Sequence, residues 1–341
     1  MIREIIDLLV DGKSMNMEQA SNVMDEIMEG RTTPGQIGAF LIALRLKGET
    51  PEEIAAMASV MARKSLRIEL DEPIVDTCGT GGDGTGTFNI STVSAFVAAG
   101  AGLKVAKHGS RAYSSNSGSA DVIEALGINL EAGPHAVKQC IQEVGIGFLF
   151  APTFHPAMRH AAPVRREIGI RTIFNMLGPL TNPTGAKHQL LGVADQSHGE
   201  KMIQVLRLLG SQHSLVVHGE DGLDEMTLGA KTRVWELCGN AVKSYTISPS
   251  DFGLPSVPLQ QLSGGSPEDN AFLLRRILMG EKGPHRDIVL LNTAGVLMVG
   301  GKTQDLEDGL TMAAEAIDNG EALLKLEALI ELSQSLSDSL E

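Results

Sequence analysis

Apolar positions through residues 1–72 recur at the three- and four-residue spacing of amphipathic helices. Residues 23–28 contain one such run. Two more runs begin at Thr33-Pro34 and Thr50-Pro51, where a hydroxyl side chain precedes a proline at the first helical position, and Gly48 ends the earlier of the two. These features predict a small N-terminal helical domain.

From Pro73 onward, short apolar runs alternate with amphipathic helices, which is typical of parallel α/β folds. We therefore predict an α/β fold in which the small helical domain (1–72) precedes a larger domain (73–341) with a mostly parallel central sheet flanked by helices. Strands are expected at 74–75, 103–106, 146–150, 190–193 and 215–217.

The segment 155–183 has a helical pattern although it lies between two predicted strands. We expect it to pack on the N-terminal helices rather than on the sheet. The chain would then cross twice between the two domains, and the crossings would form a hinge.

The 341 residues include 28 basic and 42 acidic side chains, which give a formal charge of −14. This balance argues against binding to nucleic acid through bulk charge. No apolar stretch has the length of a membrane span, and Glu4 and Asp7 occupy the region where a signal peptide is basic. We expect a cytoplasmic protein with no membrane partner.

The cysteines Cys78, Cys140 and Cys238 are few, scattered and odd in number. They match neither a disulfide framework nor the spacing of zinc ligands, so reduced structural thiols are expected.

A glycine-rich loop, Gly79-Thr80-Gly81-Gly82-Asp83-Gly84-Thr85-Gly86-Thr87, follows the first predicted strand and precedes a helix. Exposed backbone N–H groups beside a helix N-terminus favour a phosphate or pyrophosphate ligand. A dinucleotide site is a weaker alternative because no acidic residue follows the second strand. A P-loop is excluded because Thr85 stands where that motif has lysine. A merely tight turn remains open, although it explains one or two glycines rather than five.

Two further strand ends point to the same edge of the sheet, where parallel strands gather their ligands. The second strand runs into Lys107-His108-Gly109-Ser110-Arg111 and a serine-rich stretch, which suits a phosphorylated ligand or a solvated loop. The polar residues of Asn89-Ile90-Ser91-Thr92 suit either helix capping or contact with phosphate or metal.

A later strand ends in His218-Gly219-Glu220-Asp221-Gly222-Leu223-Asp224-Glu225. Its four carboxylates repel one another unless water or a cation neutralises them. Mg²⁺ commonly joins one or two carboxylates to substrate phosphates, so a magnesium site and a solvated acidic turn are the two interpretations.

In combination, these motifs resemble the anthranilate phosphoribosyltransferase family, and the resemblance spans nearly the whole chain. The matching segments are Gly79–Asp83, Asn89–Thr92, Lys107–Arg111, Ser117–Asp121, Arg171–Pro183 and Asp221–Glu225. The resemblance implies two domains joined by a hinge, a homodimer formed through the helical parts, and a role in tryptophan biosynthesis. The implied reaction converts anthranilate and phosphoribosyl pyrophosphate into N-(5-phosphoribosyl)anthranilate and pyrophosphate.

The resemblance also implies roles for individual residues. Two Mg²⁺ ions are expected on Ser91, Asp224 and Glu225, and Arg165 is expected to meet the anthranilate carboxylate, with Arg166 as the alternative. The residues expected to bind phosphoribosyl pyrophosphate are Gly79, Gly82, Asp83, Thr87, Asn89, Ile90, Ser91, Thr92, Lys107, Ser115 and Ser119.

Lys107 and His108 are the candidate catalytic residues: Lys107 to stabilise the departing pyrophosphate and His108 to accept the proton of the amine. Ser110 is also expected to contact the substrate. It stands where the family usually has asparagine, a departure that concerns anthranilate more than the phosphorylated donor.

Two relatives of the same fold are alternatives. A pyrimidine nucleoside phosphorylase would use free phosphate and would not need Asp224 and Glu225 for a metal-bound pyrophosphate. A nucleic-acid-binding relative should present a basic face, against which the charge of −14 and the intact glycine loop both argue.

Overall fold

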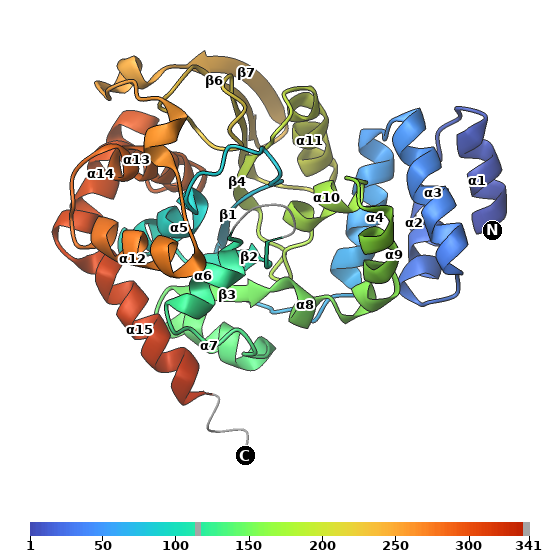
Figure 1. Ribbon diagram of the computed structural model, residues 1–341, viewed down its shortest axis with the longest axis horizontal. Helices are drawn as coiled ribbons and strands as arrows, with labels where there is room; N and C mark the ends of the chain where they lie inside the picture. Colours follow the sequence, from blue (N-terminus) through green and yellow to red (C-terminus); the bar gives the residue numbers. More distant parts are fainter. Residues whose placement is uncertain (113–116, 337–341) are drawn as a thin grey trace.

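The computed structural model describes residues 1–112 and 117–336, which form a helical part and a larger α/β part (Figure 1). The helical part begins with α1 (Ile2–Val10), α2 (Met17–Met28), α3 (Pro34–Lys47) and α4 (Pro51–Arg63). Capping boxes at Asn16, Thr33 and Thr50 satisfy N–H groups at the starts of α2, α3 and α4. The helical pattern of the first residues therefore predicted these elements correctly.

A seven-stranded sheet with the order β3-β2-β1-β4-β5-β6-β7 forms the centre of the α/β part. The first five strands in this order are parallel, whereas β6 and β7 are antiparallel and form one edge. The prediction of a mostly parallel sheet is confirmed. The strands are β1 (Val75–Gly79), β2 (Val105–Gly109), β3 (Ile146–Phe150), β4 (His188–Gly192), β5 (His213–Gly219), β6 (Thr232–Cys238) and β7 (Ala241–Ile247).

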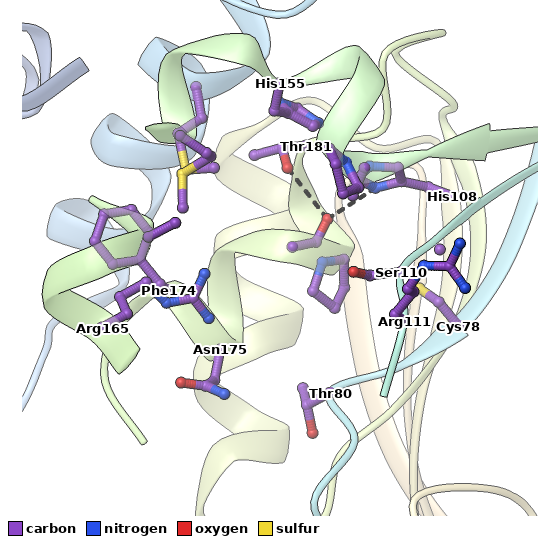
Figure 2. Close-up of a pocket in the computed structure, with 18 of the residues that line it drawn as sticks. Cys78, Thr80, His108, Ser110, Arg111, His155, Arg165, Phe174, Asn175 and Thr181 are labelled. Carbon is purple, nitrogen blue, oxygen red and sulfur yellow. Dashed lines mark hydrogen bonds between the residues drawn. The ribbon is translucent and has the colours of Figure 1, made fainter. Parts of the chain in front are cut away.

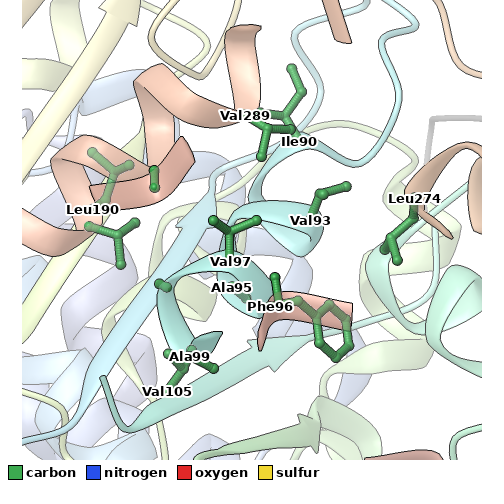
Figure 3. Close-up of a cluster of buried hydrophobic side chains, with 14 of the residues drawn as sticks. Ile90, Val93, Ala95, Phe96, Val97, Ala99, Val105, Leu190, Leu274 and Val289 are labelled. Carbon is green, nitrogen blue, oxygen red and sulfur yellow. The ribbon is translucent and has the colours of Figure 1, made fainter. Parts of the chain in front are cut away.

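One face of the sheet is covered by α5 (Ile90–Gly100) and α13 (Pro284–Val299), whose side chains interdigitate with those of the strands (Figure 3). Helices α12 (Pro267–Leu278), α14 (Leu306–Asp318) and α15 (Glu321–Ser335) pack outside them. Val97 and Val289 are fully buried in this core. Aliphatic side chains make up most of this cluster, so its stability depends on their close packing.

The opposite face carries α11 (Ser197–Leu208), which packs on both the sheet and α4. One apolar cluster therefore runs without interruption from the helical bundle to Leu191 and Val216 of the sheet. At the other end, α6 (Ser119–Ala125) contacts α12 and α7 (Pro134–Glu143) contacts β3. Among the described residues, no helix is long and apolar enough to cross a membrane.

The chain between β3 and β4 forms a series of short helices: α8 (Ala151–Phe154), η1 (Pro156–His160), α9 (Ala162–Ile168), α10 (Phe174–Leu177) and η2 (Gly178–Leu180). Of these, η1 contacts α2, α9 contacts α3 and α10 contacts α4. In Figure 1 this green segment lies between the sheet and the blue N-terminal helices. This connecting segment (residues 151–187) therefore joins the two parts of the molecule at the carboxyl ends of the central strands. Two further short turns, η3 (Pro249–Phe252) and η4 (Leu259–Leu262), follow β7.

Candidate functional site

The glycine loop (residues 79–87) leaves β1 at the carboxyl edge of the sheet and enters α5. Gly82 has a φ of +70°, a left-handed backbone that favours glycine, and a Cβ there would clash with the guanidinium of Arg171. The Arg171 guanidinium donates to the carbonyl oxygens of Thr80 and Gly81. Arg171 comes from the connecting segment, and its own carbonyl accepts a hydrogen bond from Arg45 of α3. The helical part thus contacts the loop through one arginine, which the motif analysis did not identify as a site residue.

The acidic segment after β5 meets the same loop. The Gly81 N–H donates to Oδ2 of Asp224 at 2.7 Å, and the Ser91 N–H donates to Oε1 of Glu225 at 3.2 Å. A Cβ at Gly192 would clash with the Asp224 carbonyl oxygen, so the end of β4 must be glycine for this approach. The structure therefore brings together the carboxylates and the glycine loop, as the strand ends predicted.

Only two of the four predicted carboxylates face the glycine loop. Asp221 accepts a hydrogen bond from the Thr227 hydroxyl at 2.6 Å and stabilises its own turn, while Glu220 is exposed. Burial and the neighbouring charge of Asp83 raise the pKa of Asp224 to about 7. Burial and the charge of Asp224 raise the pKa of Glu225 to about 8. These carboxylates lack sufficient positive charge around them, which is the condition that a divalent cation would relieve.

The donor set also indicates which cation fits. Among the described residues, no three histidine, cysteine or acidic side chains converge as a closed metal cage. Two carboxylates with the Ser91 hydroxyl nearby form an open set of oxygen ligands. Such a set suits Mg²⁺, which keeps waters and shares its coordination with substrate phosphates.

Lys107 and His108 are consecutive residues of β2, so their side chains point to opposite faces of the sheet. The Lys107 ammonium lies on the α5 side, where it donates to the Thr77 carbonyl at 2.8 Å and to the Ser91 hydroxyl at 3.1 Å. Burial lowers the pKa of Lys107, while Asp76 and Glu225 oppose that shift. Lys107 therefore lies beside the glycine loop and the carboxylates.

Asn89 precedes α5, but its side chain does not cap the helix. The Asn89 side chain makes no capping bond; it donates to the Ser117 carbonyl at 3.2 Å and accepts from Asn270 of α12 at 3.0 Å. The interpretation of Asn89 as a capping side chain is therefore wrong. Asn270 is a supporting residue that sequence reasoning missed because it lies far away along the chain.

The other residues predicted to bind phosphoribosyl pyrophosphate lie in different environments. Thr87 makes a β-bridge with Ser263 and, like Ser119, is partly exposed, whereas Ile90 and Thr92 are buried. The Thr92 hydroxyl finds no hydrogen-bond partner within the described ranges. Ser115 lies outside the described residues.

An apolar cavity of about 600 Å³ opens on the opposite side of β2, between the strand ends and the connecting segment (Figure 2). Figure 2 shows Arg165 and Phe174 on one wall and His108, Ser110 and Arg111 across from them. The Arg165 guanidinium lies 5.2 Å from the centre of the Phe174 ring. Arg166 also lines the cavity, so both arginines named from the sequence lie at it. Gly79 and Thr80 line it too and connect it to the glycine loop.

Two buried imidazoles lie at the inner end of this cavity. The rings of His108 and His155 are 5.0 Å apart, and Nδ1–H of His108 donates to the Gly178 carbonyl at 3.2 Å. Burial lowers the pKa of His108 to about 3 and of His155 to about 4, so both rings are neutral at pH 7. Nε2 of His108 then carries a lone pair, and it has no hydrogen-bond partner among the described residues.

A buried pair behind His108 joins the connecting segment to the sheet. The amide nitrogen of Asn182 donates to Oδ2 of Asp76 at 2.9 Å and to the Ala106 carbonyl at 2.8 Å. The other Asp76 oxygen accepts the backbone N–H of His108 at 3.4 Å. Strands β1 and β2 are thereby held to the segment that carries Arg165.

Taken together, the site has two compartments. One contains backbone N–H groups, a buried ammonium and carboxylates suited to a divalent cation, and this combination can bind a polyphosphate and stabilise its departure. The other is apolar, with arginines at one wall and neutral imidazoles at another, which suits a planar aromatic acid. Gly79 and Thr80 lie at their junction, where the two ligands can react.

Comparison with known proteins finds relatives of both parts of the chain. Residues 3–65 match the family model described as the helical bundle domain of a glycosyl transferase family, and residues 71–323 match its a/b domain. The anthranilate phosphoribosyltransferase of Dehalococcoides mccartyi is 58% identical over 339 residues, which cover 99% of each chain. That of Chloroflexus aurantiacus is 52% identical over 98% of this chain and 99% of the relative.

Solved structures agree with the sequence comparisons. The anthranilate phosphoribosyltransferase of Thermus thermophilus matches with a TM-score of 0.92 and 46% identity, over 97% of this chain and 99% of the other. The Saccharomyces cerevisiae enzyme in complex with phosphoribosyl pyrophosphate and Mg matches with a TM-score of 0.91 and 31% identity, over 98% of each chain.

Each neutral imidazole contributes a stability that is lost as the pH falls, opposite in sign to the contributions of Asp224 and Glu225, whose pKa values are raised. The pKa of His155 is about 4 in the folded chain against an ordinary value of 6.5, so below pH 6.5 the unfolded chain binds a proton first and is favoured. Between pH 7 and pH 5 this residue should account for about 2 kcal/mol of lost unfolding free energy. In urea unfolding, a His155→Asn variant should therefore gain that amount of unfolding free energy relative to wild type between pH 7 and pH 5. Exposed His135, changed to asparagine, is the control, and equal pH dependence in wild type and His155→Asn would contradict the expectation.

Proposed function

The chain belongs to the anthranilate phosphoribosyltransferase family and transfers the phosphoribosyl group of phosphoribosyl pyrophosphate to the amine of anthranilate, and we propose that its two compartments divide these substrates between them. The products are N-(5-phosphoribosyl)anthranilate and pyrophosphate, formed in tryptophan biosynthesis. The proposal depends on one observation: an anion- and cation-binding crevice and an apolar cavity meet at Gly79 and Thr80. The nucleoside phosphorylase and nucleic-acid-binding alternatives are not favoured.

We propose that the glycine-loop compartment holds the donor. Loop N–H groups and Lys107 would bind the pyrophosphate, and Asn89, fixed by Asn270, would bind the ribosyl phosphate end together with serines of the following loop. Asp224, Glu225 and Ser91 would hold two Mg²⁺ ions, with Glu225 shared between them. When bound, Mg²⁺ supplies neutralisation of the charge that develops on the departing pyrophosphate.

The acceptor would occupy the apolar cavity, with its ring against Phe174 and its carboxylate on Arg165. A guanidinium forms charge-assisted hydrogen bonds with a carboxylate, and Arg165 projects from α9 on the wall opposite His108 (Figure 2). The amine would then point toward Gly79 and the anomeric carbon of the donor. Ser110 is exposed at the same rim, where its short side chain leaves space beside the ring.

In the transfer, the bond from the anomeric carbon to pyrophosphate breaks as the bond to the amine nitrogen forms, and the sugar develops oxocarbenium character. The aromatic amine is neutral at pH 7, so attack needs no prior deprotonation. The nitrogen loses its proton afterwards, and Nε2 of neutral His108 is available to accept it. Because the lowered pKa makes this ring a weak base, positioning of the two substrates is the larger contribution to the rate.

We further propose that residues 155–183 form one domain with residues 1–72, while the remaining chain from residue 73 onward forms the other. Val164, Phe174 and Leu177 are buried in the same apolar cluster as the N-terminal helices. Arg165 would then belong to one domain and Ser110 to the other. Movement at the two crossings would change the width of the acceptor cavity.

Cytoplasmic localisation is part of the same proposal. The three cysteines are free thiols in the structure, and Cys238 is exposed, so a reducing compartment suits the chain.

The reaction can be tested by following the loss of anthranilate fluorescence with phosphoribosyl pyrophosphate and Mg²⁺. We expect turnover that stops on chelation with EDTA and returns with added Mg²⁺, because the carboxylates require a cation beside the pyrophosphate. Calorimetry with Mn²⁺ and phosphoribosyl pyrophosphate should count two ions per chain. A count of one would contradict the two-ion site alone, while turnover in EDTA, or none with Mg²⁺, would contradict the proposed function.

Arg165→Ala should raise the KM for anthranilate roughly 10- to 100-fold, which corresponds to the loss of one charge-assisted hydrogen bond of about 1.5–3 kcal/mol. The KM for phosphoribosyl pyrophosphate should change little. Arg166→Ala is the matched control, since it removes the neighbouring guanidinium on the same helix. If Arg166→Ala shows the larger effect, Arg166 binds the carboxylate instead.

We propose that two chains associate through their helical domains. Leu46 and Val10 of these helices are 82% and 72% exposed, and burying such side chains favours association. Sedimentation equilibrium should give twice the chain mass of 36.1 kDa, and Leu46→Glu should shift the protein toward monomer. A wild-type monomer would refute the dimer.

A further inference from the structure

Asn292 is a polar residue within an apolar helix. It lies in the middle of α13 between Leu291 and Thr293, and its side chain is completely buried. A primary amide in such a position costs free energy unless all its hydrogen-bonding groups are satisfied. The structure satisfies them all, and most of the partners lie outside the helix.

The partners of Asn292 outside the helix are the two backbone groups of one residue. Oδ1 accepts the Met226 N–H at 2.9 Å, and Nδ2 donates to the Met226 carbonyl at 2.9 Å. The second Nδ2 hydrogen goes to the Ile288 carbonyl, one helical turn back, also at 2.9 Å. The side chain therefore makes with Met226 the same pair of hydrogen bonds that the backbone of a neighbouring strand would make. Its orientation is fixed, because a flipped amide would lose these bonds.

Met226 directly follows Asp224 and Glu225. These residues lie between β5 and β6, in a segment outside the ladders of the sheet. The segment is closely packed on both sides: a Cβ at Gly192 would clash with the Asp224 carbonyl oxygen, and one at Gly295 would lie 2.6 Å from the Met226 methyl carbon. Asn292 is the polar contact that sets the position of the segment relative to α13.

We propose that Asn292 is a positioning residue for donor binding: by pairing with both backbone groups of Met226, it places the Asp224 and Glu225 carboxylates at the glycine loop. The inference extends the proposed function, because it assumes that these carboxylates hold the cation. It also explains why the Gly81 and Ser91 N–H groups meet the two carboxylates, since small shifts of Met226 would separate them. Asn292 does not line the acceptor cavity, so its effect should be confined to the donor.

Two variants and one matched control test this role. Asn292→Leu keeps a similar volume and removes the amide. Asn292→Ser is a second variant. Its hydroxyl can still donate to the Ile288 carbonyl, which keeps the hydrogen bond within the helix, while both hydrogen bonds to Met226 are lost. Thr293→Val is the control: Thr293 is equally buried, and its hydroxyl has no partner among the described residues.

The decisive measurement is calorimetric binding of phosphoribosyl pyrophosphate with Mg²⁺ in the absence of anthranilate, followed by steady-state kinetics. Loss of a residue that orients metal ligands typically weakens metal binding roughly 10- to 100-fold. We expect both Asn292 variants to lose donor affinity by that factor, and to need correspondingly more Mg²⁺ for half-maximal rate. At saturating donor and Mg²⁺, the KM for anthranilate should change less than about twofold, because α13 packs on the other face of the sheet from the acceptor cavity. Thr293→Val should bind like wild type.

A merely structural role would give a different result. If the variants melt at lower temperature but bind Mg²⁺ and the donor as wild type does, Asn292 only stabilises the core and the inference is overturned. If, at saturating donor, they weaken the binding of anthranilate as much as they weaken the binding of the donor, the effect is not positional and the inference is again overturned. If wild type binds the donor equally well without Mg²⁺, the metal site of the proposed function fails together with the inference.

Discussion

The structure depends on holding two carboxylates beside each other at the edge of the sheet, in a segment that belongs to no strand. The Asp224 carboxylate accepts the N–H of Gly81 in the glycine loop, and the Glu225 carboxylate accepts the N–H of Ser91 at the start of α5. Mutual repulsion and burial oppose this arrangement, as the raised pKa of each group shows. Burying charge is tolerated where the opposite charge is supplied at the moment of binding. The protein alone therefore leaves the carboxylates short of positive charge, which Mg²⁺ bound together with the donor would supply in the proposed function. The tight packing around Met226 opposes their movement into water.

The two compartments lie on opposite sides of the sheet because side chains alternate in direction along a β-strand. Neighbouring residues of a strand face opposite sides, so Lys107 enters the polar crevice while His108 enters the apolar cavity. In the proposed arrangement, one strand end would serve both substrates and bring them to a common point at Gly79. The same alternation places the side chain of Asp76, which accepts from Asn182, on the side of the sheet that faces the connecting segment.

What could be predicted from the sequence was local. The glycine loop, the lysine after β2 and the acidic turn are contiguous motifs, and their meeting follows from the parallel order of the strands. Arg171, Asn182, Asn270 and Asn292 act across large separations in sequence, so a pattern of neighbouring residues carries no signal for their contacts. The β6–β7 hairpin was missed although its signal was present. Its strands are rich in β-branched and aromatic residues and are joined by Gly239-Asn240, a favoured two-residue turn.

The size of the acceptor cavity limits how selectivity can arise. A volume of about 600 Å³ lies in the range that encloses a drug-sized ligand, which is more than one aromatic ring with two small substituents fills. Steric fit alone therefore selects poorly in this arrangement, and Ser110, being short and exposed, adds little restriction at the rim. In the proposed arrangement, selectivity would come from the directional contact of Arg165 with the carboxylate and from the donor ribose, which would occupy part of the space beside Thr80. The acceptor would then be recognised fully only when the donor is already in place, which makes occupancy of the glycine loop a condition for specificity as well as for chemistry.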